Sequence, residues 1–124
     1  MGRAPCRSIF HIEQLSRSEE GWQANVRIDP RHPVFGGHFP GMPITPGATL
    51  VQLVQELLSQ ALDTDLLMRE ARSIKFLAPV DPTKWTELIW NLRVREEEGN
   101  ILCDASGTAD DRPFLSMKAS FVRA

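Results

Sequence analysis

A segment rich in proline and glycine, residues 29–47, constrains this chain more than any other feature. More than half of the chain's nine prolines and half of its eight glycines fall within it. Proline lacks a backbone N–H and fixes φ, which excludes a regular helix or a central strand here. Long ordered loops in small domains tend to carry function. We therefore expect residues 29–47 to form a shaped loop that holds an active site.

Directly after this loop the sequence predicts a helix over residues 47–62. Pro46 and Gly47 suit its start, where a missing N–H or a missing side chain does no harm. Apolar residues recur at the spacing of one helical face, at Leu50, Leu53, Val54, Leu57, Leu58 and Ala61. Polar residues are predicted for the opposite face, at Gln52, Gln55, Glu56, Ser59 and Gln60.

Most of the remaining chain is typical of half-buried strands, with apolar and polar residues in alternation. We expect a hairpin before the loop and four strands after the helix, over residues 7–15, 22–28, 72–80, 85–96, 101–109 and 114–122. So many strands with one long helix predict an α+β fold, in which an antiparallel sheet wraps around a central helix. The length of 124 residues fits one domain, 1–124.

Composition excludes several classes of partner. The formal net charge is -2, and no block of basic residues is present. A surface for nucleic acid or for an anionic membrane is therefore not expected. No apolar run approaches the length that spans a bilayer, and residues 1–7 lack the apolar core of a signal peptide, so we expect a cytoplasmic protein. Cys6 and Cys103 are expected to be reduced thiols.

The loop ends in a motif that can be compared with known families. Residues 38–47 read His-Phe-Pro-Gly-Met-Pro-Ile-Thr-Pro-Gly. This stretch resembles the signature His-Phe-Pro-Gly-x-Pro-x-x-Pro-Gly of the 3-hydroxyacyl-acyl-carrier-protein dehydratases, and every fixed position is present. Residues 73–82, Ser-Ile-Lys-Phe-Leu-Ala-Pro-Val-Asp-Pro, resemble that family's strand after the helix. The predicted strand order also agrees, so the resemblance covers nearly the whole chain.

The resemblance implies a hotdog fold that works as a homodimer or a higher oligomer, without a metal or an organic cofactor. It implies dehydration of a 3-hydroxyacyl chain carried on acyl carrier protein or coenzyme A. His38 would remove the α-proton, because an imidazole can act as a base near neutral pH. The backbone N–H of Gly47, at the positive end of the helix dipole, would bind the thioester carbonyl. Phe39 and Pro46 are expected beside the substrate.

The predicted helix departs from the family pattern at one position. The family places a carboxylate fourteen residues after the motif histidine, where this chain has Gln52. Glutamine can orient a hydroxyl group but cannot donate a proton as an acid. Glu56 lies one turn later, and positions i and i+4 share a helix face. We expect Glu56 to act as the displaced acid with Gln52 as its hydrogen-bonding partner; the alternative is a Glu56 that is simply solvated or ion-paired.

Three functions stay open, in this order. The first is a dehydratase of fatty-acid synthesis or of related polyene or polyketide synthesis. The second is a hotdog thioesterase, since such enzymes often carry a single carboxylate on the central helix, and Glu56 is the candidate. The third is a non-catalytic protein that binds acyl thioesters or acyl carrier protein, which the loss of the acid at Gln52 favours. His11 and His32 lack the context of His38 and are interpreted as incidental.

Overall fold

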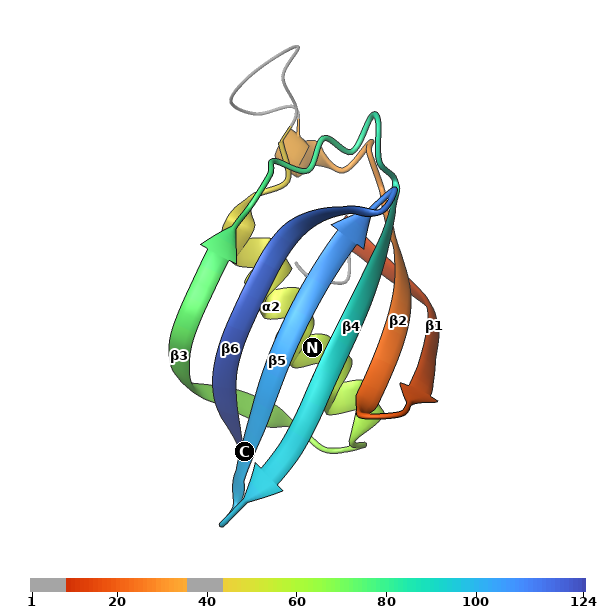
Figure 1. Ribbon diagram of the computed structural model, residues 1–124. Coiled ribbons are helices and arrows are strands. Elements are labelled where there is room, and N and C mark those ends of the chain that lie inside the picture. Colours follow the sequence, from red (N-terminus) through yellow and green to blue (C-terminus); the bar gives the residue numbers. More distant parts are fainter. Residues whose placement is uncertain (1–8, 36–43) are drawn as a thin grey trace.

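Six antiparallel strands wrap around a long α-helix in the computed structural model, which describes residues 9–35 and 44–124 (Figure 1). The elements are β1 (Phe10–Ser18), β2 (Gly21–Ile28), the 3-10 helix η1 (Pro33–Phe35), α2 (Gly47–Ala61), β3 (Leu66–Phe76), β4 (Glu87–Glu97), β5 (Asn100–Ala109) and β6 (Arg112–Arg123). The order of the strands across the sheet is β1-β2-β4-β5-β6-β3. The predicted α+β class is confirmed.

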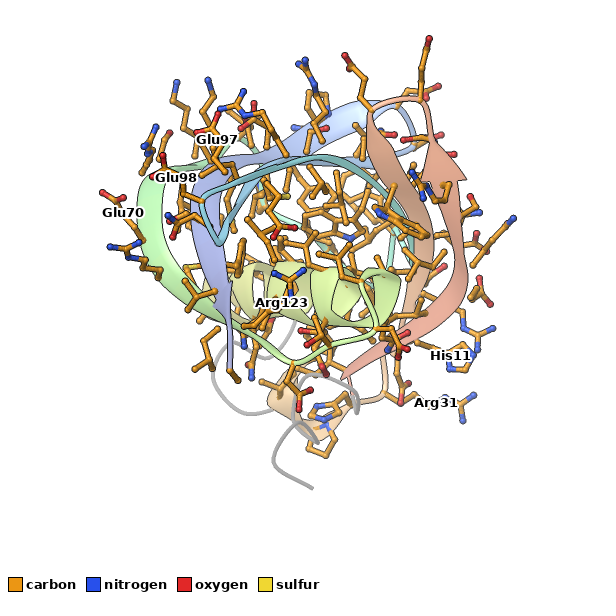
Figure 2. The ribbon with its side chains drawn as sticks, turned by 90° about the horizontal axis from the view of Figure 1, so that it is seen from below. His11, Arg31, Glu70, Glu97, Glu98 and Arg123 are labelled. Atoms are coloured by element: carbon orange, nitrogen blue, oxygen red, sulfur yellow. The ribbon has the colours of Figure 1, made fainter. Side chains whose placement is uncertain are left out.

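Strands β4 and β5 form the centre of the sheet because every second side chain is apolar. Leu88, Trp90 and Leu92 of β4 are buried, and the residues between them are exposed. Cys103 and Ala105 of β5 face the same side, as their alternation predicted. The Trp90 ring meets the Phe114 ring of β6 edge to face, with centroids 5.3 Å apart. Figure 2 shows side chains filling the space between the sheet and the helix.

The apolar face of α2 lies against this inner surface of the sheet. Leu53, Val54, Leu57 and Leu58 are at most 1% exposed. Burial of each such side chain stabilises the fold by about 1.5–3 kcal/mol. The helix therefore has one fixed orientation relative to the sheet, and its other residues are placed by that orientation.

Strand β3 closes one edge of the sheet and bends around the helix (Figure 1). Its pairing with β6 shifts register between Met68 and Glu70 and again between Ala71 and Ser73. Such bulges bend a strand and increase its twist. The bend brings the beginning of β3 beside α2, where Gln55 Oε1 accepts a hydrogen bond from the Met68 N–H at 2.9 Å.

Some predicted boundaries were wrong. The hairpin of β1 and β2 closes through Glu19 and Glu20 alone, with Ser18 paired to Gly21, so the polar residues 16–18 belong to β1 rather than to a longer turn. Strand β3 spans Leu66–Phe76 rather than residues 72–80. Helix α2 ends at Ala61, one residue before the predicted end.

The described parts of the segment 29–47 are held by local hydrogen bonds. Asp29 Oδ1 accepts from the Arg31 N–H at 2.9 Å, and His32 Nδ1 accepts from the Val34 N–H at 3.1 Å. Residues 33–35 form one turn of 3-10 helix, and residues 44–46 are irregular. The prediction of a loop without regular helix or strand agrees with these parts, apart from this short turn.

Candidate active site

The N-terminus of α2 lies at the end of the signature motif. Pro46 is the N-cap, with an extended backbone at φ -61° and ψ 134°, and no side chain among the described residues caps the helix. The first turn contains no acidic residue. Backbone N–H groups at such a terminus point away from the helix and sit at the positive end of its dipole. This end of α2 has the polarity that a carbonyl with developing negative charge requires.

Thr45 fixes the position of this terminus. Its backbone N–H and its Oγ1 both donate to the carbonyl oxygen of Val80, each at 2.9 Å. Thr45 is only 3% exposed, so these bonds are shielded from water. Sequence reasoning missed Thr45; the signal available was a hydroxyl residue inside an otherwise apolar and proline-rich motif.

Gly47 is in close contact with Phe76, the last residue of β3. A Cβ atom on Gly47 would lie 2.8 Å from both Cε1 and Cζ of the Phe76 ring. The ring thus occupies the volume that any side chain at residue 47 would take. Phe76 itself is 55% exposed, so only one side of the ring is packed. The glycine at this position is explained by the close approach of the ring.

Gln52 and Glu56 have different environments, although they are separated by one helical turn. Gln52 is exposed, whereas Glu56 is 5% exposed and lies among the buried residues of α2. The assignment of Glu56 to the polar face was therefore wrong, and so was the alternative of a solvated side chain. Glu56 stands at the border of the apolar stripe, beside Leu57.

His38 and Phe39 lie outside the described residues, so their predicted roles stay predictions. The other two histidines are described and belong elsewhere. His11 is exposed on β1 and points away from the interior (Figure 2). His32 makes its local bond to the Val34 N–H. Their interpretation as incidental agrees with these positions.

Cys103 is described and does not have the properties of a nucleophile. It is a free thiol buried on β5. Burial, with a smaller contribution from the charge of Asp104, raises the pKa of Cys103 to about 12. A thiol with such a pKa stays protonated at neutral pH, and the thiolate is the reactive form. Cysteine chemistry at this position is excluded.

Three surface hollows lined by described residues lie away from the candidate residues. Hollows of about 530, 470 and 320 Å³ occupy the outer face of the sheet and the ends of β1 and β2, and their linings are rich in charged side chains. Gly47, Gln52 and Glu56 line none of them. Within residues 9–35 and 44–124, no group of three or more His, Cys, Asp or Glu side chains is placed to hold a metal ion. No helix in the same residues is long and apolar enough to cross a membrane.

The fold defines the class of protein first. The chain has the hotdog fold, and its similarity to solved hotdog structures extends over nearly its full length. A chain of the dehydratase heterocomplex ApeI:P from Xenorhabdus doucetiae superposes with a TM-score of 0.75 at 19% identity, covering 91% of this chain and 97% of that one. A hypothetical thioesterase with coenzyme A from Streptococcus pneumoniae TIGR4 gives 0.63 at 14% identity, covering 93% and 85%.

Sequence similarity identifies the family within this class. The family model described as ApeI-like, ApeI dehydratase, matches residues 14–112, and the chain belongs to this family. A 3-hydroxyacyl-[acyl-carrier-protein] dehydratase FabZ from Sulfurovum sp. (strain NBC37-1) is 29% identical over 116 residues, covering 84% of this chain and 75% of the relative. The expected resemblance to the 3-hydroxyacyl-acyl-carrier-protein dehydratases is confirmed.

Proposed function

We propose that this protein dehydrates 3-hydroxyacyl thioesters to trans-2-enoyl thioesters. Membership of a dehydratase family gives the class of reaction. The observation that carries the proposal is the N-terminus of α2 at the end of a complete signature motif, where no side chain among the described residues caps the helix and Thr45 holds the backbone in place. The reaction needs a dipole at that point, because proton loss next to a thioester places negative charge on the carbonyl oxygen.

In the proposed mechanism the chain supplies a base, a carbonyl-binding group and an acid. His38 takes the α-proton, and the Gly47 N–H holds the carbonyl oxygen as its charge grows. Pro46 and Phe39 border the substrate. Glu56 gives a proton to the departing 3-hydroxyl group, and Gln52 orients it. One molecule of water leaves, and a double bond forms between the α- and β-carbons.

The burial of Glu56 supports its role as the acid. Burying a carboxylic acid costs free energy, and α2 has no other charged side chain. An ionisable residue kept at the border of the apolar face of an otherwise uncharged helix is a functional candidate. Gln52, exposed on a single chain, is available to a partner subunit or to the substrate.

We propose that the working unit is a homodimer joined at β3, with higher oligomers open. The beginning of the β3 edge is covered, because Ser59 Oγ accepts from the Leu66 N–H at 3.1 Å and Gln55 accepts from Met68. The part from Glu70 to Phe76 lies at the edge of the sheet. A strand at the edge of a sheet can pair with the same strand of a second copy.

The substrate carrier in this proposal is acyl carrier protein or coenzyme A. The curated relative is named for acyl carrier protein, and the pneumococcal structure holds coenzyme A. The pathway is fatty-acid synthesis or a related polyene or polyketide synthesis, in the cytoplasm, by a single domain over residues 1–124. No metal or organic cofactor enters the proposed steps.

Two other functions have an observation in their favour. A thioesterase needs one carboxylate beside the thioester, and the buried Glu56 supplies it on a fold that the pneumococcal protein shares. A non-catalytic binder is favoured by the exposed Gln52 at the position where the family carries its acid.

Product mass separates these functions. The purified protein is incubated with 3-hydroxyacyl chains of several lengths, each on acyl carrier protein and on coenzyme A, and the products are measured by mass spectrometry. Loss of one water by the wild type, abolished in His38→Ala and retained in the exposed control His11→Ala, supports the dehydratase. A free acid identifies a thioesterase. Binding without turnover on either carrier identifies a binder and excludes the proposed reaction.

A further inference from the structure

The side chain of Phe76 combines two properties that rarely occur together. Cε1 and Cζ of its ring lie 2.8 Å from the position that a Cβ atom on Gly47 would take. Yet 55% of the residue is exposed on a single chain. A large apolar side chain that is packed on one side only, next to a candidate carbonyl-binding group, is suited to touch a ligand on its other side.

The direction of the contact places the ring beside the Gly47 N–H. In an α-helix the Cα–Cβ bond tilts toward the N-terminus, and the backbone N–H groups point the same way. Atoms that fill the Cβ position of the first helical residue therefore lie next to whatever its N–H binds. Phe76 fills that position at Gly47.

Backbone hydrogen bonds hold the chain on both sides of this contact. Phe76 pairs with Leu115 of β6, and the next residue, Leu77, donates its N–H to the Phe114 carbonyl at 2.8 Å. On the side of α2, the hydrogen bonds from Thr45 to the Val80 carbonyl oxygen hold the backbone that enters the helix. The size and rotamer of one side chain, Phe76, thus set the space beside the helix N-terminus.

We propose that Phe76 is a specificity-determining residue, whose ring admits thioesters with an unbranched α-carbon and excludes those with an α-methyl group. The inference rests on the proposed function, because it takes the thioester carbonyl to lie at the Gly47 N–H. The α-carbon is bonded directly to the carbonyl carbon. It is therefore the first atom of the acyl chain whose substituents reach the ring.

An α-methyl substrate leaves the chemistry unchanged, which isolates the steric effect. A 3-hydroxy-2-methylacyl thioester retains one hydrogen on its α-carbon. Removal of that hydrogen as a proton, with departure of the 3-hydroxyl group, releases one water and gives a 2-methyl-2-enoyl thioester. The bonds that form and break are the same as for the unbranched chain, so a difference in rate reports on space.

The test compares two probes, the pantetheine thioesters of 3-hydroxybutyrate and of 3-hydroxy-2-methylbutyrate. The ratio of kcat/KM for the unbranched to the branched probe is measured for the wild type, Phe76→Ala and Phe76→Leu. Leu77→Ala is the matched control, because Leu77 is the neighbouring apolar residue and is 53% exposed. Size-exclusion chromatography with light scattering establishes that all variants have the oligomeric state of the wild type.

One methyl group in a fitted site changes discrimination by about 10- to 200-fold. We expect Phe76→Ala to lower the ratio by an amount in that range, Phe76→Leu to lower it less, and Leu77→Ala to leave it unchanged. A ratio in Phe76→Ala equal to that of the wild type would overturn the inference.

If the proposed dehydratase function is wrong, the result differs from the one that would overturn the role of Phe76. In that case the wild type dehydrates neither probe, and the affinities of the same two probes are measured by calorimetry. Phe76→Ala is then expected to bring the two affinities closer together. Unchanged affinity ratios in both Phe76 variants would overturn the inference in that setting too.

Discussion

The two ends of helix α2 are held in different ways. At the C-terminal half, Gln55 and Ser59 accept hydrogen bonds from backbone N–H groups of β3, and the last turn closes with backbone bonds of its own. At the N-terminal end, Thr45 fixes the backbone that enters the helix, and no side chain among the described residues caps Gly47. The C-terminal half is therefore anchored by side chains, whereas the N-terminal end presents backbone N–H groups.

This difference suits the N-terminal end of α2 to the carbonyl-binding role that we propose for it. The anchored half gives α2 a fixed position against the sheet. The backbone N–H groups at the other end are therefore held in place and can bind a ligand. Preorganised donors are effective because they need no rearrangement when charge develops. As a consequence, the surroundings of this helix end depend on Phe76, whose ring is packed on one side only.

The largest expected effect comes from removing the packing of the anchored half. Leu58→Ala deletes a side chain that is 0% exposed, and we expect the free energy of unfolding to fall by about 2–5 kcal/mol. Urea unfolding followed by circular dichroism measures it. Gln60→Ala, on the exposed side of the same turn, is the control and should stay within about 0.5 kcal/mol. Equal effects of both would mean that this half is not anchored by its apolar face.

A smaller effect is expected from removing the hydrogen bonds of that half. Gln55→Ala leaves the Met68 N–H without its acceptor, and Ser59→Ala does the same to Leu66. Each should lower the free energy of unfolding by about 1–3 kcal/mol, because a partly buried donor loses its partner. Amide hydrogen exchange at Met68 and Leu66 should become faster in the corresponding variant. Unchanged exchange at these amides, compared with the control Gln52→Ala, would contradict the anchoring.

The smallest expected effect concerns the contact between Gly47 and Phe76 at the N-terminal end of α2. Gly47→Ala places a Cβ against the Phe76 ring, and Phe76→Ala removes that ring. A double-mutant cycle should therefore show a coupling of about 1 kcal/mol between the two positions in the free energy of unfolding. Gly47→Ala should be unfavourable in the wild type and neutral or favourable in Phe76→Ala. Strict additivity would mean that the ring does not restrict residue 47.

Sequence patterns predicted most of the fold because alternation and helical spacing are local. Strands β2, β4, β5 and β6 and helix α2 were expected close to their observed bounds. The start of β3 was missed. Residues 66–71, Leu-Leu-Met-Arg-Glu-Ala, are good helix formers without alternation, and only their pairing with β6 makes them a strand. Such pairing is a property of the assembled sheet.

The sequence predicted some features of the candidate site and missed others, for the same reason. The position of Gly47 at the start of α2 follows from the loop and the helical pattern, and it is observed. The burial of Glu56 is a property of the assembled fold, which the periodicity of the helix does not specify. The contact of Phe76 with Gly47 joins two segments that only β3 pairing and the Thr45–Val80 bonds bring together.

The central proposal is that, in this member of a dehydratase family, the acid lies one turn later than in the family pattern, at Glu56 in place of residue 52. The most direct measurement is kcat for dehydration of a 3-hydroxyacyl thioester on acyl carrier protein by Glu56→Gln and by the exchanged pair Gln52→Glu/Glu56→Gln. We predict that Glu56→Gln, which keeps the size of the side chain, lowers kcat by about 100-fold or more, and that the exchanged pair recovers part of it. Wild-type kcat in a folded Glu56→Gln variant would contradict the claim.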